Sequence, residues 1–550
     1  MPENCCGCLP RKRKKKSANE LYEPLLLESE RDAINDLLRF LQTDDGGSVL
    51  SDERVRALRT LACSDNVDLK RSAALCYSEI SEKMTSTVTN DMLEPLIALV
   101  QYPDPEVQTA SSLALSNFAL FGPVENKNAI VRAGALQALT ACLSSDNVDV
   151  QCNACGCMTT LATSEHNKYE IVNQGAVPSL LKLACSRDSR VQRNATGALL
   201  NLTHLESNRF ELARCGAIPI FVSLIQSRDP DIQFYCAAAL SNMAVQEQHR
   251  SLMSQISGGE VLRHLIALLS SPVEKVKCQA CLALRNLASD ANNQVKIVDF
   301  GGLRSLYPLL GTSDVECCTA AIAALRNLSI CKGNEIAIIR EKFLPVINKL
   351  LVSGSHPDIQ CHAAGTLRNL STEDHKDEIL KAGSVTALVD VLLDSHTSVG
   401  VCAEASAALA VLAANERCQE HMAELRDGQF VQAVLEMCVS AEGNEVRYNC
   451  VGIVGHLALN AELHPLLLNS KASILEVIRT CVQTGDASSI HIGVWALSHL
   501  SEGGDETRRI IGESRLMDLL ERMGGDDMAT ELKQLIDTTL KNLQPKVDNT

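Results

Sequence analysis

The sequence predicts an all-α fold in which short helical repeats stack into one elongated array. An apolar phrase that ends in a polar residue recurs along the chain, for example as Ala-Leu-Ser-Asn at 114–117 and Ala-Leu-Arg-Asn at 324–327. From Asn117 to His499 the phrase recurs in nine steps of 41 to 45 residues. Periods of roughly 40–47 residues are typical of stacked helical repeats. Because each repeat packs only on its neighbours, a chain of 550 residues can form one such array.

One cycle of the period indicates how many helices each repeat contains. Residues 165–173 are predicted to form a short first helix, which Gly175 ends because glycine adopts left-handed backbone angles at little cost. A second helix is predicted over 178–184, a turn over 188–191 and a long third helix over 192–203. Three helices per repeat favour armadillo repeats over two-helix HEAT repeats. The predicted fold is therefore an armadillo-repeat right-handed superhelical solenoid of about eleven three-helix repeats.

Three features recur at fixed places in this cycle. Acidic or Asn turns precede the third helix, as in Asp146-Asn147-Val148-Asp149 and Asp229-Pro230-Asp231. The helix-ending glycine recurs as Gly134, Gly175, Gly216, Gly259, Gly302, Gly383 and Gly428. The residue that ends the apolar phrase defines a ladder position, held in turn by Tyr77, Asn117, Thr160, Asn201, Asn242, Asn286, Asn327, Asn369, Val411, His456 and His499.

Six of the ladder positions carry asparagine, which is unusual inside an apolar helical phrase. Asparagine is a poor helix former, and a buried amide without a partner costs about 1–3 kcal/mol. A single such residue could make a local structural bond, but six at one phase of the helix indicate a shared cause. If third helices stack side by side, these amides form a stripe on the concave face that can bond the backbone of an extended peptide. The predicted partner-binding residues are Asn117, Asn201, Asn242, Asn286, Asn327 and Asn369.

Arginine precedes the ladder asparagine in three successive repeats, as Arg285, Arg326 and Arg368. In an otherwise acidic protein these residues would form a local basic stripe beside the ladder. Arginine favours carboxylate and phosphate groups through forked hydrogen bonds. The sequence therefore predicts extended, acidic segments of other proteins as partners, although three solvated arginines on an exposed face remain the alternative.

The bulk composition limits the classes of function. The net charge of −16 and a pI near 5.4 make the body of the chain a poor non-specific binder of nucleic acid. The chain has 23 cysteines but no apolar run typical of a signal peptide, and no stretch of roughly 18 apolar residues that could span a membrane. We expect a reduced, cytosolic setting in which most cysteines are small buried side chains.

Residues 1–30 differ from the rest of the chain because they lack its periodicity and cluster prolines and charge. Cys5, Cys6 and Cys8 are predicted to be acylated, because cysteines beside a polybasic run are typical S-acylation sites. The bases would add attraction to an anionic membrane surface. Pro2 excludes N-myristoylation, and a plain disordered tail or a nuclear-import peptide are the alternatives. The basic residues are Arg11, Lys12, Arg13, Lys14, Lys15 and Lys16.

The repeats are expected to cover residues 31–505. Residues 506–550 are expected to add two amphipathic helices and a polar tail that cap the last repeat. The sequence leaves self-association of the array open.

The residues described so far resemble those of the armadillo-repeat proteins, and most closely the fungal vacuolar armadillo-repeat membrane anchors. The resemblance covers nearly the whole chain and includes its Cys-Cys-x-Cys start. It implies a scaffold on the cytosolic face of a vacuolar or lysosome-like membrane that serves organelle contact, organelle inheritance and autophagy-related targeting. The family usually has a glycine where this chain has Pro2, so the plasma membrane is an alternative location. The phrases that carry the resemblance span 69–75, 150–154, 191–201, 276–280 and 282–290.

Two other classes of function were weighed. Nuclear-import adaptors also have an asparagine ladder but place tryptophan one turn before it, where this chain has Leu113, Gly197, Ala238, Leu282, Ala323 and Gly365. An enzyme or zinc site is suggested by the spacing of Cys152, Cys155 and Cys157, yet these cysteines lie inside a predicted third helix where other repeats place small core residues. No phosphate-binding loop or nucleophile elbow is present in the sequence. We predict a binding protein without catalytic residues, metal or cofactor.

Overall fold

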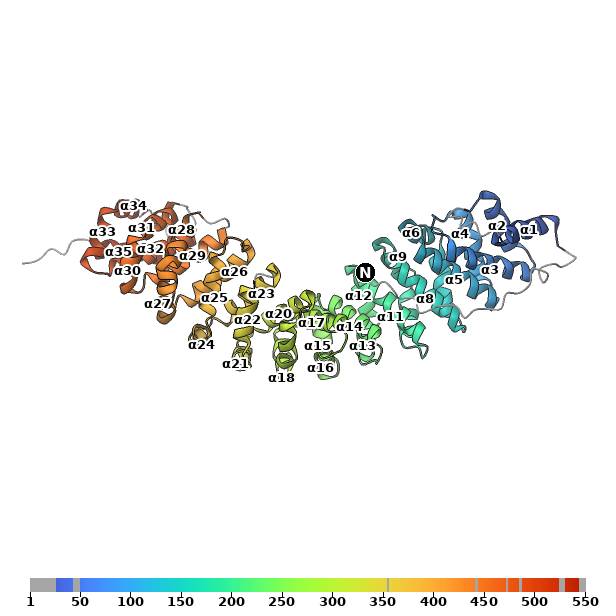
Figure 1. The fold of residues 1–550 in the computed structure, drawn as a ribbon, viewed down its shortest axis with the longest axis horizontal. Helices are drawn as coiled ribbons and strands as arrows, with labels where there is room; N and C mark the ends of the chain where they lie inside the picture. Colours follow the sequence, from blue (N-terminus) through green and yellow to red (C-terminus); the bar gives the residue numbers. More distant parts are fainter. Residues whose placement is uncertain are drawn as a thin grey trace, which may run out of the picture. The chain divides into compact units, whose positions relative to one another are not determined.

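A computed structural model describes residues 26–42, 50–353, 356–440, 444–470, 473–483, 487–523 and 530–543. All regular secondary structure within these ranges is helical, which confirms the predicted all-α fold. The chain divides into two compact units, residues 1–283 and 284–550, with the boundary inside α17. Within each unit consecutive third helices pack side by side, as in α5·α8·α11 and α23·α26·α29, so each unit is a stack of repeats (Figure 1).

The helices fall into the three predicted classes. The third helices are α3 (Val67–Lys83), α5 (Pro105–Phe121), α8 (Val148–Leu161), α11 (Ser189–Thr203), α14 (Pro230–Met243), α17 (Glu274–Leu287), α20 (Val315–Leu328), α23 (Pro357–Leu370), α26 (Val399–Leu412), α29 (Asn444–Leu457) and α32 (Ala487–Ser501). The second helices are α2 (Asp52–Cys63), α4 (Asn90–Gln101), α7 (Ala135–Cys142), α10 (Ala176–Ala184), α13 (Ala217–Leu224), α16 (Glu260–Leu268), α19 (Gly302–Leu306), α22 (Phe343–Val352), α25 (Ser384–Leu393), α28 (Gln429–Ser440) and α31 (Ile474–Gln483).

Apart from the 15-residue α1, the first helices are shorter than the third helices, and the second repeat has an irregular segment between α3 and α4 in place of one. They are α1 (Glu28–Gln42), α6 (Val124–Arg132), α9 (Glu165–Asn173), α12 (Glu206–Arg214), α15 (Glu247–Gln255), α18 (Ala291–Asp299), α21 (Lys332–Arg340), α24 (Lys376–Lys381), α27 (Glu416–Glu424) and α30 (His464–Asn469). Short 3₁₀ segments adjoin several helices: η2 (Ile256–Gly258), η3 (Tyr307–Gly311), η4 (Glu373–His375), η5 (Leu425–Gly428) and η6 (Ala461–Leu463).

The carboxyl-terminal part of the chain departs from the expected pair of capping helices. It contains three helices, α33 (Asp505–Glu513), α34 (Leu516–Met523) and α35 (Thr530–Leu543), and α35 packs on α32 as one third helix packs on another. The side-chain amide of Asn542 on α35 donates to Ser501 Oγ at 3.2 Å. Since Ser501 lies two residues after His499, this contact has the register of the ladder bonds in earlier repeats. The segment is a further repeat, and its ladder residue is Asn542.

The glycine between the first and second helices is left-handed, as predicted, in most repeats. Positive φ is found at Gly134, Gly175, Gly216, Gly259, Gly383 and Gly428, with values of 74° to 92°. The prediction was wrong by one residue in the seventh repeat, where Gly301 has φ 83° and Gly302 begins α19. Gly302 is needed for a different reason, because a Cβ there would lie 2.7 Å from the main-chain oxygen of Ile297.

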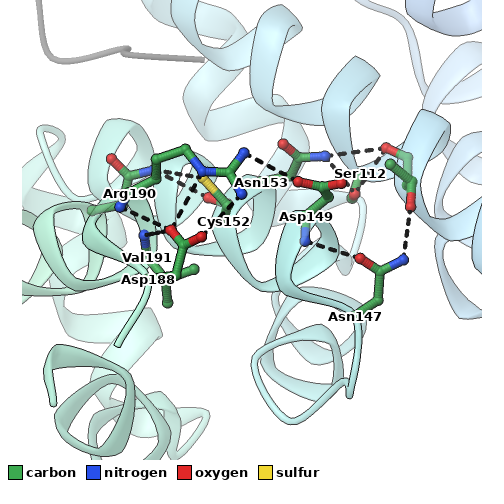
Figure 2. Close-up of polar contacts among 10 residues, drawn as sticks. Ser112, Asn147, Asp149, Cys152, Asn153, Asp188, Arg190 and Val191 are labelled. Atoms are coloured by element: carbon green, nitrogen blue, oxygen red, sulfur yellow. Dashed lines mark hydrogen bonds and ion pairs between the residues drawn. The ribbon is translucent and has the colours of Figure 1, made fainter. Parts of the chain in front are cut away.

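The predicted Asp and Asn turns are N-caps of the third helices. Asp188 Oδ1 accepts hydrogen bonds from the N–H groups of Arg190 (2.9 Å) and Val191 (3.2 Å) at the start of α11 (Figure 2). The Arg190 side chain then bonds Asp188 Oδ2 and Asp149 Oδ1, each at 3.1 Å, and so links α11 to the neighbouring α8. Asn66, Asp104, Asn147, Asp229 and Asp314 cap their helices in the same way.

Replacing Asp188 with alanine is expected to lower the free energy of unfolding by about 1–2 kcal/mol, because both cap bonds are lost. Asp188→Asn keeps an acceptor for the cap but removes the charge that pairs with Arg190, so its cost should be below about 1 kcal/mol. Urea unfolding of the two variants measures the difference. Equal losses in both would mean that the ion pair, and not the cap, stabilises this turn.

The Asp188 turn also predicts how the stability of the fold depends on pH. The Arg190 guanidinium, which donates to Asp188, holds the pKa of that carboxyl below its usual value. A lowered pKa in the folded state means that the carboxylate stabilises the fold above the unfolded pKa of about 3.9, and that this contribution is lost as pH falls through the folded pKa. Asp188→Asn should therefore lose less stability than the wild type as the pH falls through this range.

Cysteines fill the core between the repeats, as predicted. Cys155 and Cys157 on α8 are fully buried, and burial raises the pKa of Cys155 to about 12. Cys281 occupies the same place on α17 and is also buried. In the described ranges, no three His, Cys, Asp or Glu side chains are grouped so that they could hold a metal ion.

Across the residues that the structure describes, no single helix has both the length and the apolar character needed to cross a bilayer. One bent pair, α29 with residues 461–469, passes that test on length and composition together.

Candidate partner-binding surface

The six ladder asparagines lie on third helices and are brought into register by the stacking of those helices. Asn117 is buried, and the other five are half-buried. In three of them the amide nitrogen donates to a main-chain oxygen of the preceding third helix: Asn201 to Thr159 (2.9 Å), Asn327 to Arg285 (2.8 Å) and Asn369 to Arg326 (3.2 Å). Amides also donate to hydroxyl groups of the preceding helix: Asn117 to Ser81 (3.1 Å), Asn242 to Thr203 (2.9 Å) and Asn369 to Ser329 (3.1 Å).

These bonds give the ladder asparagines a structural role. The sequence suggested such a role only for a single asparagine taken by itself. An amide has two N–H donors and an oxygen acceptor, so the bonds to the preceding repeat use only part of its capacity. The stacking bonds also fix the direction of the five amides that make them. Structural and binding roles are therefore compatible in one side chain.

Tyr77 does not occupy a ladder position. It is fully buried, and its hydroxyl donates to the main-chain oxygen of Met92 at 3.1 Å. Asn117 bonds Ser81, and in later repeats such a hydroxyl lies two residues after the ladder residue. The same register places the exposed Glu79 at the ladder position of α3. The phrase around Tyr77 was too weak to fix this shift of two residues.

A second ladder of polar side chains, on the first helices, was missed from the sequence. Its members are buried and bond main-chain oxygens: for example, Asn334 donates to Gln294 O (3.2 Å) in the preceding first helix and to Leu328 O (3.0 Å) at the end of α20, the third helix of the preceding repeat. A spacing of 41 to 44 residues could have revealed it. The buried ladder consists of Asn126, Asn167, Asn208, His249, Asn293 and Asn334.

The structure brings two of the three predicted arginines together around one acid. Arg326 Nη2 donates to Glu404 Oε1, and Arg368 Nη1 lies 2.8 Å from Glu404 Oε2. Glu404 is on α26, in the repeat after Arg368, and its side chain is 14% exposed. Arg285 makes a different contact, because its guanidinium donates to Oδ1 of the adjacent Asn286 at 3.1 and 3.2 Å. The basic stripe therefore contains a two-arginine carboxylate site that already holds a carboxylate.

Glycine beneath the stripe makes room for this arrangement. A Cβ at Gly365 would lie 2.6 Å from Nε and 2.9 Å from Cζ of Arg326. The Arg326 guanidinium therefore lies over Gly365, at the place where a nuclear-import adaptor would have tryptophan. His362, one turn earlier on α23, has a lowered pKa because it is buried and because Arg326 and Arg285 are near. The neutral His362 side chain therefore does not compete with the two arginines for the Glu404 carboxylate.

Glu404 was also missed from the sequence. It lies seven residues before the ladder residue Val411, where other repeats have uncharged side chains such as Asn194 and Asn449. Those two amides donate to main-chain oxygens of the preceding third helix. An acid at this otherwise neutral place was the available signal.

The single tryptophan belongs to the carboxyl-terminal end of the ladder. The Trp495 ring meets the rings of His456 and His499 edge to face, with centroids 5.2 and 5.3 Å apart. Both histidines are at ladder positions, so the two repeats before the last one have edge-to-face aromatic side chains in place of the amides.

The predicted acylation sites and the basic run, Cys5, Cys6, Cys8 and residues 11–16, lie outside the described residues.

The fold and this surface define an armadillo-repeat protein. The Armadillo/beta-catenin-like repeat family matches residues 123–163, 164–204, 206–245, 260–289 and 290–330. A solved chain from a study of a phosphorylation switch between cadherin and beta-catenin superimposes with a TM-score of 0.72 over 88% of this chain and 99% of its own, at 15% identity, which shows the fold alone. An engineered protein superimposes with a TM-score of 0.66 over 73% of this chain and 98% of its own, at 28% identity.

Full-length relatives then give the family. Vacuolar protein 8 of Schizosaccharomyces pombe is 45% identical over 507 residues, which cover 91% of this chain and 90% of the relative. Vacuolar protein 8 of Candida albicans is 44% identical over 93% of this chain and 87% of the relative, and that of Saccharomyces cerevisiae is 38% identical over 98% and 90%. The chain belongs to the vacuolar protein 8 family. This confirms the predicted resemblance and supports a vacuolar armadillo-repeat scaffold that binds other proteins.

Proposed function

We propose that this chain is a scaffold, lipid-anchored to the cytosolic face of the vacuole membrane, that binds extended acidic segments of partner proteins along its ladder. Through such segments it would serve organelle contact, organelle inheritance and autophagy-related targeting. One observation supports the acidic partner most strongly: Arg326 and Arg368 hold the two oxygens of one carboxylate. This contact supports a carboxylate as the ligand of these two arginines.

The ladder supplies the part of binding that does not depend on partner sequence. Amides on successive third helices, such as Asn327 and Asn369, lie at a repeating interval and are held by bonds to the preceding repeat. An extended backbone offers alternating N–H and C=O groups, which amides can bond whatever the side chains. The arginines beside the ladder would then select acidic segments over others.

Arg326→Ala is expected to weaken binding of a glutamate-rich peptide about 5- to 30-fold, the equivalent of roughly 1–2 kcal/mol for a lost charged hydrogen bond. The variant should remain folded, because Glu404 keeps Arg368 as its partner and a partly exposed ion pair contributes no more than about 1 kcal/mol. Fluorescence anisotropy with a labelled peptide measures affinity, and thermal unfolding monitors the fold.

Arg304→Ala provides a matched control. Arg304 lies in the same unit, has an 81% exposed side chain and pairs with Glu341 away from the ladder. If both alanine variants weaken the peptide equally, the effect is one of net charge and the stripe is not the binding site. A large fall in thermal stability of Arg326→Ala would likewise refute a binding role for this residue.

A further inference from the structure

The binding groups of the basic stripe are not free in the chain by itself. Arg326 and Arg368 have side chains that are 25% and 36% exposed, while the Glu404 carboxylate between them is 14% exposed. The acid is thus the least accessible member of the group. Any external carboxylate that reaches both arginines has to take the place of this one.

The surroundings of Glu404 favour exchange over permanent attachment. Arg326 and Arg368 pair with the Glu404 carboxylate, and burial together with the Glu404 charge raises the pKa of the nearby Cys361, so the thiol stays neutral. The Arg326 guanidinium lies over Gly365, whose missing side chain leaves room for the arginine against α23. Arg285, one repeat before Arg326, donates to a neutral amide oxygen, so this contact does not pair its charge with a carboxylate.

We propose that Glu404 is an internal competitor for the acidic partner, which binds by displacing it from Arg326 and Arg368. This inference rests on the proposed function of the ladder and adds a selection rule to it. Exchanging one carboxylate for another at the arginine pair gains little by itself. A segment with one acid therefore binds poorly, whereas a segment whose further acids reach Arg285 gains a contact that no carboxylate in the described part of the chain makes.

The spacing of the partner's acids follows from the geometry of the stack. Packed helices lie about 8–10 Å apart, and a peptide in the polyproline II conformation advances about 3.1 Å per residue with three residues per turn, so every third side chain lies on the same face. Acids about three residues apart would therefore reach arginines on successive third helices. The suitable probe is a labelled ten-residue peptide with Glu at the second, fifth and eighth positions in a Ser/Ala background.

The test compares the affinity of this probe for full-length wild type and Glu404→Gln. Removing the competitor should tighten binding about 2- to 10-fold, the range expected for a partly exposed ion pair that no longer has to be broken. The gain should vanish in the Arg326→Ala/Arg368→Ala background, where there is no site to compete for. Glu445→Gln, the same charge change at an exposed position of α29, should leave affinity unchanged.

The outcomes separate the two proposals. If Glu404→Gln binds as the wild type does, or more weakly, while Arg326→Ala still loses affinity, the competitor inference is overturned and Glu404 is a support that positions the arginines. If neither protein binds the probe, the proposed function fails and this inference fails with it. Should thermal unfolding show that Glu404→Gln does not fold, Glu404→Asp replaces it, since a carboxylate one methylene shorter is a weaker competitor and must also tighten binding.

Discussion

Replacing Asn334 with alanine is expected to lower the free energy of unfolding by about 2–3 kcal/mol, more than any ladder asparagine would. Asn334 is 2% exposed and donates to the main-chain oxygens of Gln294 and Leu328, so one side chain joins α21 to the first helix α18 and the third helix α20 of the preceding repeat. Alanine removes both hydrogen bonds and leaves a small cavity that the neighbouring side chains do not fill. Buried groups without partners cost about 1–3 kcal/mol.

Asn327→Ala is the matched control, since it makes the same chemical change seven residues earlier, on the adjoining third helix α20. Asn327 is half-buried and donates to Arg285 O at 2.8 Å, a bond that water can partly replace. Its loss should cost no more than about 1 kcal/mol. Because repeat arrays can unfold in parts, hydrogen exchange over α20–α22 should accompany urea unfolding of both variants. Greater destabilisation by Asn327→Ala would assign the main stacking role to the ladder, and leave the buried ladder without one.

Replacing Cys5, Cys6 and Cys8 together with alanine is expected to release the protein from the membrane. A single acyl chain holds a protein only marginally, and stable attachment takes two signals. The six basic residues at 11–16 would each contribute about 1 kcal/mol near an anionic surface, which is one signal of the two. Without acyl chains, the bases alone should leave most of the protein in the soluble fraction.

Live-cell imaging and fractionation measure this release, and single cysteine variants show how many acyl chains are needed. Neutralising residues 11–16 while keeping the cysteines is the complementary variant, and should weaken attachment without abolishing it. A wild-type protein that is itself soluble or nuclear would contradict the anchored scaffold and favour an adaptor of the nuclear-import type.

The sequence allowed the repeat architecture to be predicted because its signals are local and recur. The Asp and Asn caps and the left-handed glycines act within a few residues, so their period of about 42 residues is visible without a structure. The ladder asparagines were found for the same reason, since an amide inside an apolar helical phrase is conspicuous. Asn542 was missed although its phrase, Thr-Leu-Lys-Asn at 539–542, resembles Thr-Leu-Arg-Asn at 366–369 and follows His499 by 43 residues.

What could not be predicted depends on contacts between repeats. Asn334 lies near the start of a short helix, where asparagine is common for ordinary reasons, so its burial leaves no local signal. Arg326 and Glu404 are 78 residues apart in the chain, and they meet only because three third helices stack in one register. The phrase around Tyr77 predicts a ladder position at that residue, but the stacking of the helices puts the ladder position of α3 two residues later, at Glu79.

The choice of acceptor in the ladder has an evolutionary consequence. Asn201, Asn327 and Asn369 donate to the main-chain oxygens of Thr159, Arg285 and Arg326, the residues whose side chains flank the ladder. A main-chain oxygen is present whatever side chain that residue carries. Mutation can therefore exchange the flanking side chains one by one while the hydrogen bonds between the third helices are kept. Related proteins can in this way evolve to bind new partners without any change in the stacking of their repeats.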